Sequence, residues 1–124
     1  MKNALFVGIA GAFGAIARVW MGTIFHSEAF PFGTLIPNLI GSFSLCFLSG
    51  GAIRKLTSDE SLQTAVTTGF LGSFTTFSAF SLETVELFQN GQHLLGIAYL
   101  LLSIVGGLAA GLLGSSVSRK KVSV

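Results

Sequence analysis

The chain has 124 residues, of which 51% are hydrophobic and only 10% are charged, and its formal net charge is +2. Soluble globular domains carry roughly 25% charged residues, so this chain lacks the polar side chains that would cover a water-facing surface. Together with a mean hydropathy of +0.78, the composition excludes a soluble protein, and the small positive charge gives no indication of nucleic-acid binding. We expect an all-α membrane protein that forms one domain over residues 1–124.

Four apolar segments are each long enough to cross a bilayer, which takes about 20 residues in a helix. Their approximate bounds are 4–24, 33–53, 62–88 and 93–117. The first follows Lys2 as the core of a signal peptide would, but its apolar run is too long for one and three more segments follow. The sequence therefore predicts four transmembrane helices and a multi-pass protein of the cell membrane.

The second segment combines a proline with a polar stripe. Proline deep inside a helix removes a hydrogen bond but is tolerated near the first turn, so Pro37 predicts a helix that begins near Gly33. Residues at spacings of three and four share one face of that helix: Thr34, Asn38, Gly41 and Ser42. An amide in hydrocarbon needs partners, so this stripe either joins helices together or offers donors to a ligand.

The third segment has glycines and hydroxyl side chains where a lipid-facing helix would have leucine and isoleucine. We predict that its helix breaks between Gly72 and Thr76. Non-helical backbone at membrane depth is tolerated only where it is buried in protein or lines a cavity, and its free carbonyls and amides can then bind ions. The alternative is a continuous helix whose serines and threonines bond to their own backbone.

Phe77 and Phe80 follow the predicted break, three residues apart and so on one helix face, with Ser78 and Ser81 on a neighbouring face. Aromatic rings have a positive edge. Ring edges and hydroxyls together either replace the water shell of a small anion or pack in the ordinary way against lipid and protein.

Ionisable residues inside a membrane span are costly and indicate function by default. Arg18 in the first segment either reaches the outer edge of the membrane or attracts anions in a water-filled vestibule. Glu83 and Glu86, three residues apart in the third segment, either form a polar helix end or pair with Arg18.

Charge outside the spans is unevenly distributed. With four spans, the N-terminus, the middle loop and the C-terminus lie on one side of the membrane. That side carries six Lys and Arg residues: Lys2, Arg54, Lys55, Arg119, Lys120 and Lys121. The loops of the other side carry none, so the positive-inside rule predicts cytoplasmic N- and C-termini.

Small residues three or four apart let helices approach closely. The first segment has such a row in Gly8, Gly11 and Gly14, and the fourth has one in residues 107, 111 and 114. Two interpretations stay open, namely packing within one chain and an additional contribution to a subunit interface.

Three groups of residues resemble motifs of the Fluc family of bacterial fluoride channels. In chain order they are Gly11, Gly14, Ala15 and Arg18; Gly33, Thr34, Asn38 and Gly41; and Gly72, Thr75, Thr76, Phe77, Ser78, Phe80 and Ser81. The resemblance covers the whole chain in its length, its spans and the order of its motifs. It implies an antiparallel dimer with two pores, through which cytoplasmic fluoride leaves the cell passively so that its toxicity falls.

The resemblance also implies roles for individual residues. The anion pathway that it implies contains Asn38, Phe77, Phe80, Ser81, Thr34, Tyr99, Ser103 and the vestibule residue Arg18. Glu83 matches the family's glutamate in the third span and is expected to give polar support. A further pathway serine of some members falls on Gly107 here. The backbone carbonyls of Gly72 and Thr75 match those that hold a structural sodium ion between the subunits.

One feature departs from the simplest picture of the family. Members that form homodimers by inserting in both orientations have nearly balanced loop charges, whereas this chain has six basic residues on one side and none on the other. We therefore expect a fixed orientation and a second, related chain inserted the opposite way as the natural partner. The alternative is a homodimer that forms despite the charge bias.

Two other classes of membrane protein compete with a fluoride channel. A small four-helix drug/proton exporter needs an embedded acid, and the first segment has none. A structural subunit of a larger complex would explain the small size and the glycines but not the Thr-Thr-Phe-Ser break. The sequence contains no metal cluster, nucleophile–base pair or phosphate loop, so we do not expect an enzyme.

Overall fold

A computed structural model describes residues 2–122, and every regular element among them is helical. The first predicted segment is α1 (Lys2–Ile24), and the fourth is α7 (His93–Val122). The second consists of α2 (Phe32–Phe47), the π-helical turn η1 (Leu48–Ala52) and α3 (Ile53–Leu56). The third consists of α4 (Glu60–Thr64), the π-helical η2 (Ala65–Leu71), α5 (Gly72–Phe74) and α6 (Ser78–Gln89).

Within residues 2–122, three stretches are long and apolar enough to cross a membrane, namely Lys2–Ile24, Phe32–Leu56 and His93–Lys121. The third predicted segment is not among them, because its helix ends at Phe74 and restarts at Ser78. The predicted break is therefore confirmed, at residues 75–77, and the alternative of a continuous helix is wrong. Thr75 nevertheless bonds back to its own helix, since its Oγ1 donates to the Leu71 carbonyl at 3.0 Å.

The second segment begins as predicted and ends differently. Its helix starts at Phe32, one residue before the expected Gly33, and Pro37 is buried inside it. At the other end, Gly51 has φ 116°, a left-handed conformation that favours glycine. This residue kinks the chain, and α3 then continues to Leu56 through residues that were expected to begin a loop.

Long-range packing follows the glycine rows. An ideal Cβ at Gly14 would lie 2.2 Å from the Phe70 carbonyl oxygen, so α1 approaches η2 as closely as backbone allows. At Gly114 a Cβ would lie 2.3 Å from the Phe43 carbonyl oxygen, which brings α7 against α2 in the same way. Both rows therefore serve packing within the chain. Gly8 has nothing within 4 Å, so its side of α1 faces open space.

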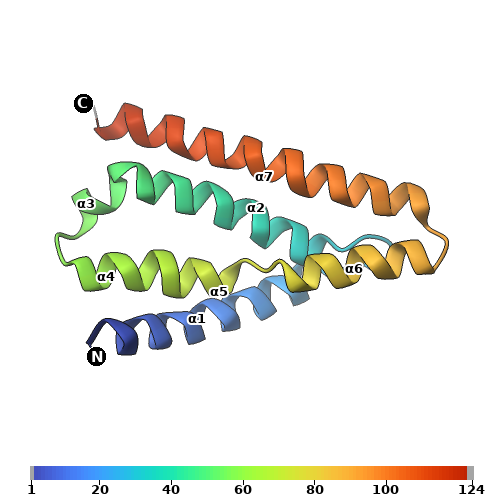
Figure 1. The fold of residues 1–124 in the computed structure, drawn as a ribbon, viewed down its shortest axis with the longest axis horizontal. Helices are drawn as coiled ribbons and strands as arrows, with labels where there is room; N and C mark the ends of the chain where they lie inside the picture. Colours follow the sequence, from blue (N-terminus) through green and yellow to red (C-terminus); the bar gives the residue numbers. More distant parts are fainter. Residues whose placement is uncertain (1, 123–124) are drawn as a thin grey trace.

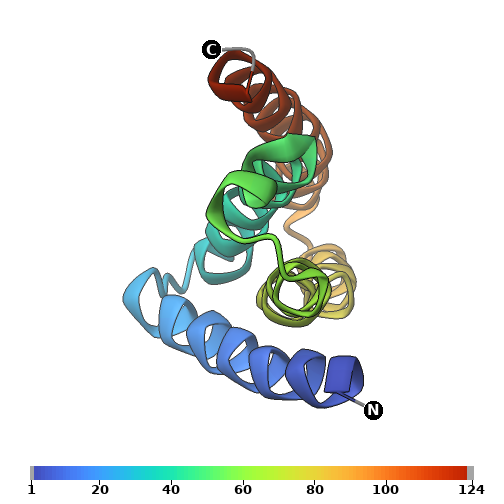
Figure 2. The same ribbon diagram turned by 90° about the vertical axis from the view of Figure 1, so that its left-hand side faces the viewer.

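The helices lie roughly side by side, with α1 and α7 at opposite edges and α2 between them (Figures 1 and 2). The N-terminus, the α3–α4 connection and the C-terminus gather at one end (Figure 1). Lys55 Nζ donates to the Lys121 carbonyl at 2.5 Å and joins two parts of this basic end. Near the other end, a buried cluster fixes α6 against α2 and α7; it consists of Leu35, Phe80, Leu87 and Tyr99.

Candidate functional site

The helix break is held by a side chain from α2. Asn38 Nδ2 donates to the Thr76 carbonyl at 2.9 Å, and Asn38 Oδ1 accepts from the Thr76 backbone N–H at 2.8 Å. A broken helix exposes backbone groups that are costly to leave unpaired in hydrocarbon. The amide supplies one donor and one acceptor in the geometry of a neighbouring backbone, so it stabilises the break that the third segment needs.

A cavity of 330 Å³ lies beside this bridge, between α2, the break and α7. Its lining includes the predicted pathway residues Asn38, Phe77, Phe80 and Ser103. Ser42 from the polar stripe of α2 also lines it, as does Gly107 on α7. We call this space the inner cavity.

The two phenylalanines of the inner cavity are neighbours with different surroundings. Their ring centroids are 5.8 Å apart and their planes are inclined by 45°. Phe80 is 9% exposed and packs on Tyr99, at 5.2 Å between centroids. Phe77 is 80% exposed and projects from the chain. One ring is thus fixed in the core, while the other is free to contact lipid or another subunit.

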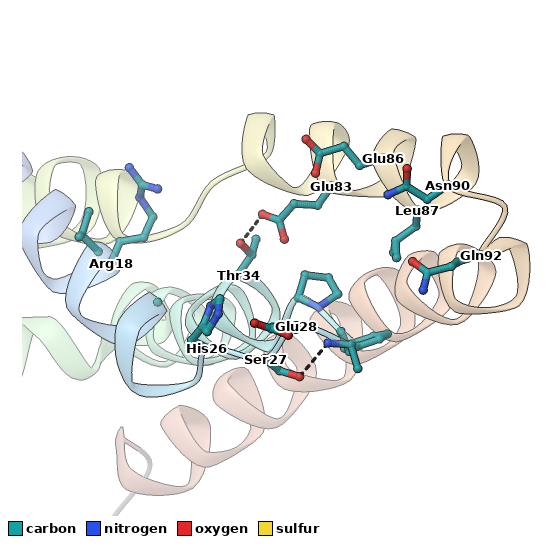
Figure 3. A pocket seen from close by; sticks show the side chains of 16 residues that line it. Arg18, His26, Ser27, Glu28, Thr34, Glu83, Glu86, Leu87, Asn90 and Gln92 are labelled. Carbon is teal, nitrogen blue, oxygen red and sulfur yellow. Dashed lines mark hydrogen bonds between the residues drawn. The ribbon is translucent and has the colours of Figure 1, made fainter.

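A second cavity, of 480 Å³, lies between α1, α2 and α6 at the end opposite the basic end; we call it the outer cavity (Figure 3). Arg18, Thr34 and Glu83 line it, together with His26 and Glu28 from the α1–α2 loop. Thr34 in the outer cavity and Asn38 in the inner cavity are four residues apart on α2. They lie about one helical turn apart, so the two cavities follow each other along one helix face.

Glu83 is held by two hydroxyl groups from different helices. Thr34 Oγ1 donates to Glu83 Oε1 at 2.6 Å, as Figure 3 shows, and the hydroxyl of the fully buried Tyr99 donates to Glu83 Oε2 at 3.5 Å. Hydrogen bonds to a charged group are stronger than those between neutral groups. The carboxylate therefore joins α2, α6 and α7 at the wall of the outer cavity.

One interpretation of the sequence paired Arg18 with Glu83 or Glu86, but the structure gives Arg18 a different partner. Its Nε donates to the Ser73 carbonyl at 3.2 Å, just before the helix break. In Figure 3 the side chain rises from α1 toward the third segment, apart from Glu83. The guanidinium thus satisfies a backbone group of the third segment and presents positive charge to the outer cavity.

The remaining predicted pathway residues lie outside both cavities. Tyr99 is buried in the core behind Phe80, and Ser81 lines neither cavity. Two partners were missed from the sequence, namely the backbone groups of Thr76 and Ser73. No pattern of side chains could indicate them, because any residue supplies the same backbone carbonyl.

The carbonyls of Gly72 and Thr75 lack their usual helical partners. In a continuous helix the Thr76 N–H would donate to the Gly72 carbonyl, but here it donates to Asn38 Oδ1. The Ala79 N–H would likewise donate to the Thr75 carbonyl, but it donates to Thr76 Oγ1 at 3.2 Å. Gly72 is exposed, with nothing within 4 Å of an added Cβ. Two carbonyl oxygens without helical partners fit the chemistry of a hard cation, which prefers oxygen ligands.

The fold and the site define a small helical membrane protein whose broken helix lines cavities with amide, hydroxyl and aromatic groups. Residues 5–115 match a family model that is described as "CrcB-like protein, Camphor Resistance (CrcB)". The chain therefore belongs to the CrcB-like family.

Several relatives share most of the sequence. The chain is 45% identical to "Fluoride-specific ion channel FluC 1" of Desulfitobacterium hafniense over 109 residues, which cover 87% of this chain and 96% of the relative. It is 43% identical to "Fluoride-specific ion channel FluC 2" of Listeria innocua over 116 residues, which cover 94% and 90%. It is 38% identical to "Fluoride-specific ion channel FluC" of Ruminiclostridium cellulolyticum over 127 residues, which cover 100% and 98%.

Proposed function

We propose that this chain is a subunit of a fluoride-specific ion channel that lets cytoplasmic fluoride leave the cell passively and so reduces its toxicity. The observation that carries the proposal is the match to relatives named fluoride-specific ion channels over nearly their full length, at up to 45% identity. A channel moves an ion without chemical conversion, so the protein is not an enzyme.

The chemistry of the two cavities supports this function. A selective pore must replace the hydration shell of its ion and still bind weakly enough for exit. Fluoride is small and strongly hydrated, so its replacement ligands must be hydrogen-bond donors and positive ring edges set close together. Asn38, Phe77, Phe80 and Ser103 meet around one cavity. We propose that fluoride passes along them, and that Arg18 draws anions into the outer cavity.

We also propose roles for the predicted pathway residues that lie outside the inner cavity. Thr34 and Tyr99 keep Glu83 in place by hydrogen bonds, and the three together form the polar wall between the cavities. Ser81, one helical turn beyond Phe77, would reach the ion only in the complete assembly.

In the membrane, the third segment would complete a set of four spans, with its break at mid-depth. The break is exposed on one side, and another protein surface must cover it there, because irregular backbone does not face lipid. The exposed Phe77 and Gly72 border it. A second subunit in the opposite orientation would cover this face and bring its own Phe77 toward the inner cavity.

The charge distribution favours a related chain as that second subunit. Six basic residues lie toward one end and none in the loops of the other, which predicts one orientation with both termini in the cytoplasm. The relatives in Desulfitobacterium and Listeria carry the numbers 1 and 2 in their names, as expected where an organism has more than one such chain. A homodimer remains the alternative, and a reporter fused to the C-terminus separates the two, because signal from both sides of the membrane contradicts a fixed orientation.

The free carbonyls of Gly72 and Thr75 would hold a structural sodium ion between the two subunits. When bound, the ion would supply positive charge that draws the breaks of two antiparallel subunits together. Each chain would contribute its own two oxygens, and waters or the second chain would complete the shell.

Fluoride efflux from liposomes that contain the purified protein tests the proposal, with a fluoride electrode as the readout and chloride-loaded liposomes as the control. We expect rapid fluoride loss without chloride loss, and its abolition by Phe80→Ile. Fluoride loss only after a related chain is added supports the heterodimer. No loss in either preparation overturns the channel and favours a structural subunit, while proton-coupled loss of an organic cation favours an exporter.

A further inference from the structure

The wall of the inner cavity contains a position without a side chain. Gly107 on α7 faces Ser42 on α2, and an ideal Cβ at Gly107 would lie 3.9 Å from Ser42 Oγ. Both residues line the cavity that also contains Asn38, Phe77 and Phe80. The absent side chain at residue 107 thus leaves the Ser42 hydroxyl open to the cavity.

Most polar side chains around this cavity already form hydrogen bonds within the protein. Asn38 bonds to both backbone groups of Thr76. Thr75 Oγ1 donates to the Leu71 carbonyl. Thr76 Oγ1 accepts from the Ala79 N–H and is shared with Ser78. Their donors therefore serve the helix break, and an ion in the cavity would have to compete for them.

Two hydroxyl groups remain. Ser42 on α2 and Ser103 on α7 line the cavity, and within residues 2–122 neither is bonded to another protein group. A half-buried hydroxyl inside a membrane protein is costly without a partner. The two face the cavity from opposite helices, and each can donate one hydrogen bond.

We propose that the Ser42 hydroxyl binds the permeating anion in the inner cavity, opposite Ser103, and that Gly107 makes room for this contact. The inference rests on the proposed fluoride channel and adds a determinant of its selectivity. Each hydroxyl can donate one hydrogen bond to an anion in the cavity, and a small, strongly hydrated anion gains more from two such donors than the larger chloride does.

The test is fluoride efflux from liposomes, in whichever preparation conducts, the chain alone or with a related second chain. Because hydrogen bonds to a charged group are stronger than those between neutral groups, Ser42→Ala is expected to lower the efflux rate by roughly tenfold or more. Ser44→Ala is the matched control, since Ser44 is a half-buried serine on the same helix that does not line the cavity. Its efflux rate should equal that of the unsubstituted protein.

A restoring variant separates a binding role from a structural one. In the Ser42→Ala protein, Gly107→Ser returns a hydroxyl to the same space from the opposite helix, and it should recover most of the lost efflux and the ratio of fluoride to chloride permeation. Ser42→Cys keeps the volume with a weaker donor and should conduct less than wild type even if Ser42→Ala misfolds.

The outcomes are distinguishable. Full efflux from Ser42→Ala or Ser42→Cys overturns the role of Ser42 and leaves the channel intact. Equal losses in Ser42→Ala and Ser44→Ala, or no recovery with Gly107→Ser, also overturn it. No fluoride efflux from the unsubstituted protein in either preparation overturns the channel itself.

Discussion

Asn38 takes the place of a missing helical partner for Thr76, because its amide bonds to both the carbonyl and the N–H of that residue, at 2.9 and 2.8 Å. The polar stripe of α2 therefore stabilises the helix break of the third segment through Asn38. The first interpretation of the stripe, a contact that joins helices, describes Asn38, while the neighbouring Ser42 is left open to the cavity.

Asn38→Asp should destabilise the protein. The substitution keeps the acceptor for the Thr76 N–H but replaces the donor with a carboxylate oxygen that faces the Thr76 carbonyl. An unpaired buried polar group costs about 1–3 kcal/mol, and we expect the free energy of unfolding, measured by SDS titration of the micellar protein, to fall by about that amount. Ser44→Ala serves as the control, and an unchanged unfolding midpoint for Asn38→Asp would contradict the bridging role.

Gly14→Ala should separate α1 from η2. Its Cβ would lie 2.2 Å from the Phe70 carbonyl oxygen, so the backbone must shift. Gly8→Ala is the matched control in the same helix, because nothing lies within 4 Å of its Cβ, and alanine favours a helix over glycine by about 1 kcal/mol. The thermal midpoint should fall for Gly14→Ala and stay or rise for Gly8→Ala; equal midpoints would contradict the packing role of the glycine row.

Glu83 and Thr34 should be energetically coupled. Glu83→Ala leaves the hydroxyls of Thr34 and the buried Tyr99 without their acceptor, whereas Glu83→Gln keeps an acceptor oxygen. We expect the larger loss of unfolding free energy for Glu83→Ala. A double-mutant cycle of Glu83→Ala with Thr34→Val should give a coupling of about 0.5–3 kcal/mol, and additive effects would contradict the 2.6 Å contact.

Arg18→Gln should slow fluoride efflux more at low than at high ionic strength. Its guanidinium lines the outer cavity, and a positive charge at a cavity mouth raises the local anion concentration until salt screens it. Arg18→Lys keeps the charge but loses the Nε bond to Ser73. Lysine should therefore preserve the salt dependence, and a rate loss for Arg18→Gln that is independent of salt would indicate only a structural role.

Replacement of sodium by N-methylglucamine on both sides of the membrane should weaken the subunit association in detergent and the fluoride flux. This large cation cannot fit between the carbonyls of Gly72 and Thr75, which lack helical partners. Cross-linking yield and efflux rate measure the two effects. Dimerisation and flux that are indifferent to sodium would argue against a structural cation at this position.

Much of the fold was predictable because it depends on local patterns. Long apolar runs determined α1 and α7, and the glycines and hydroxyls of the third segment indicated its break within about two residues. The kink at Gly51 and the π-helical turns were not predicted, since no periodicity distinguishes them from an ordinary helix. The second helical segment consequently extends three residues beyond its predicted end at Ile53.

By itself, the sequence determined that this protein lies in a membrane, since a chain with 10% charged residues has too few polar side chains to form a water-facing surface. It also determined which polar residues are out of place there and therefore need partners. The tertiary structure decided those partners: Asn38 with Thr76, Arg18 with Ser73, and Glu83 with Thr34. The physical reason is that these contacts join residues 38 to 55 positions apart, and two of the three acceptors are backbone carbonyls, which every residue has and only packing selects.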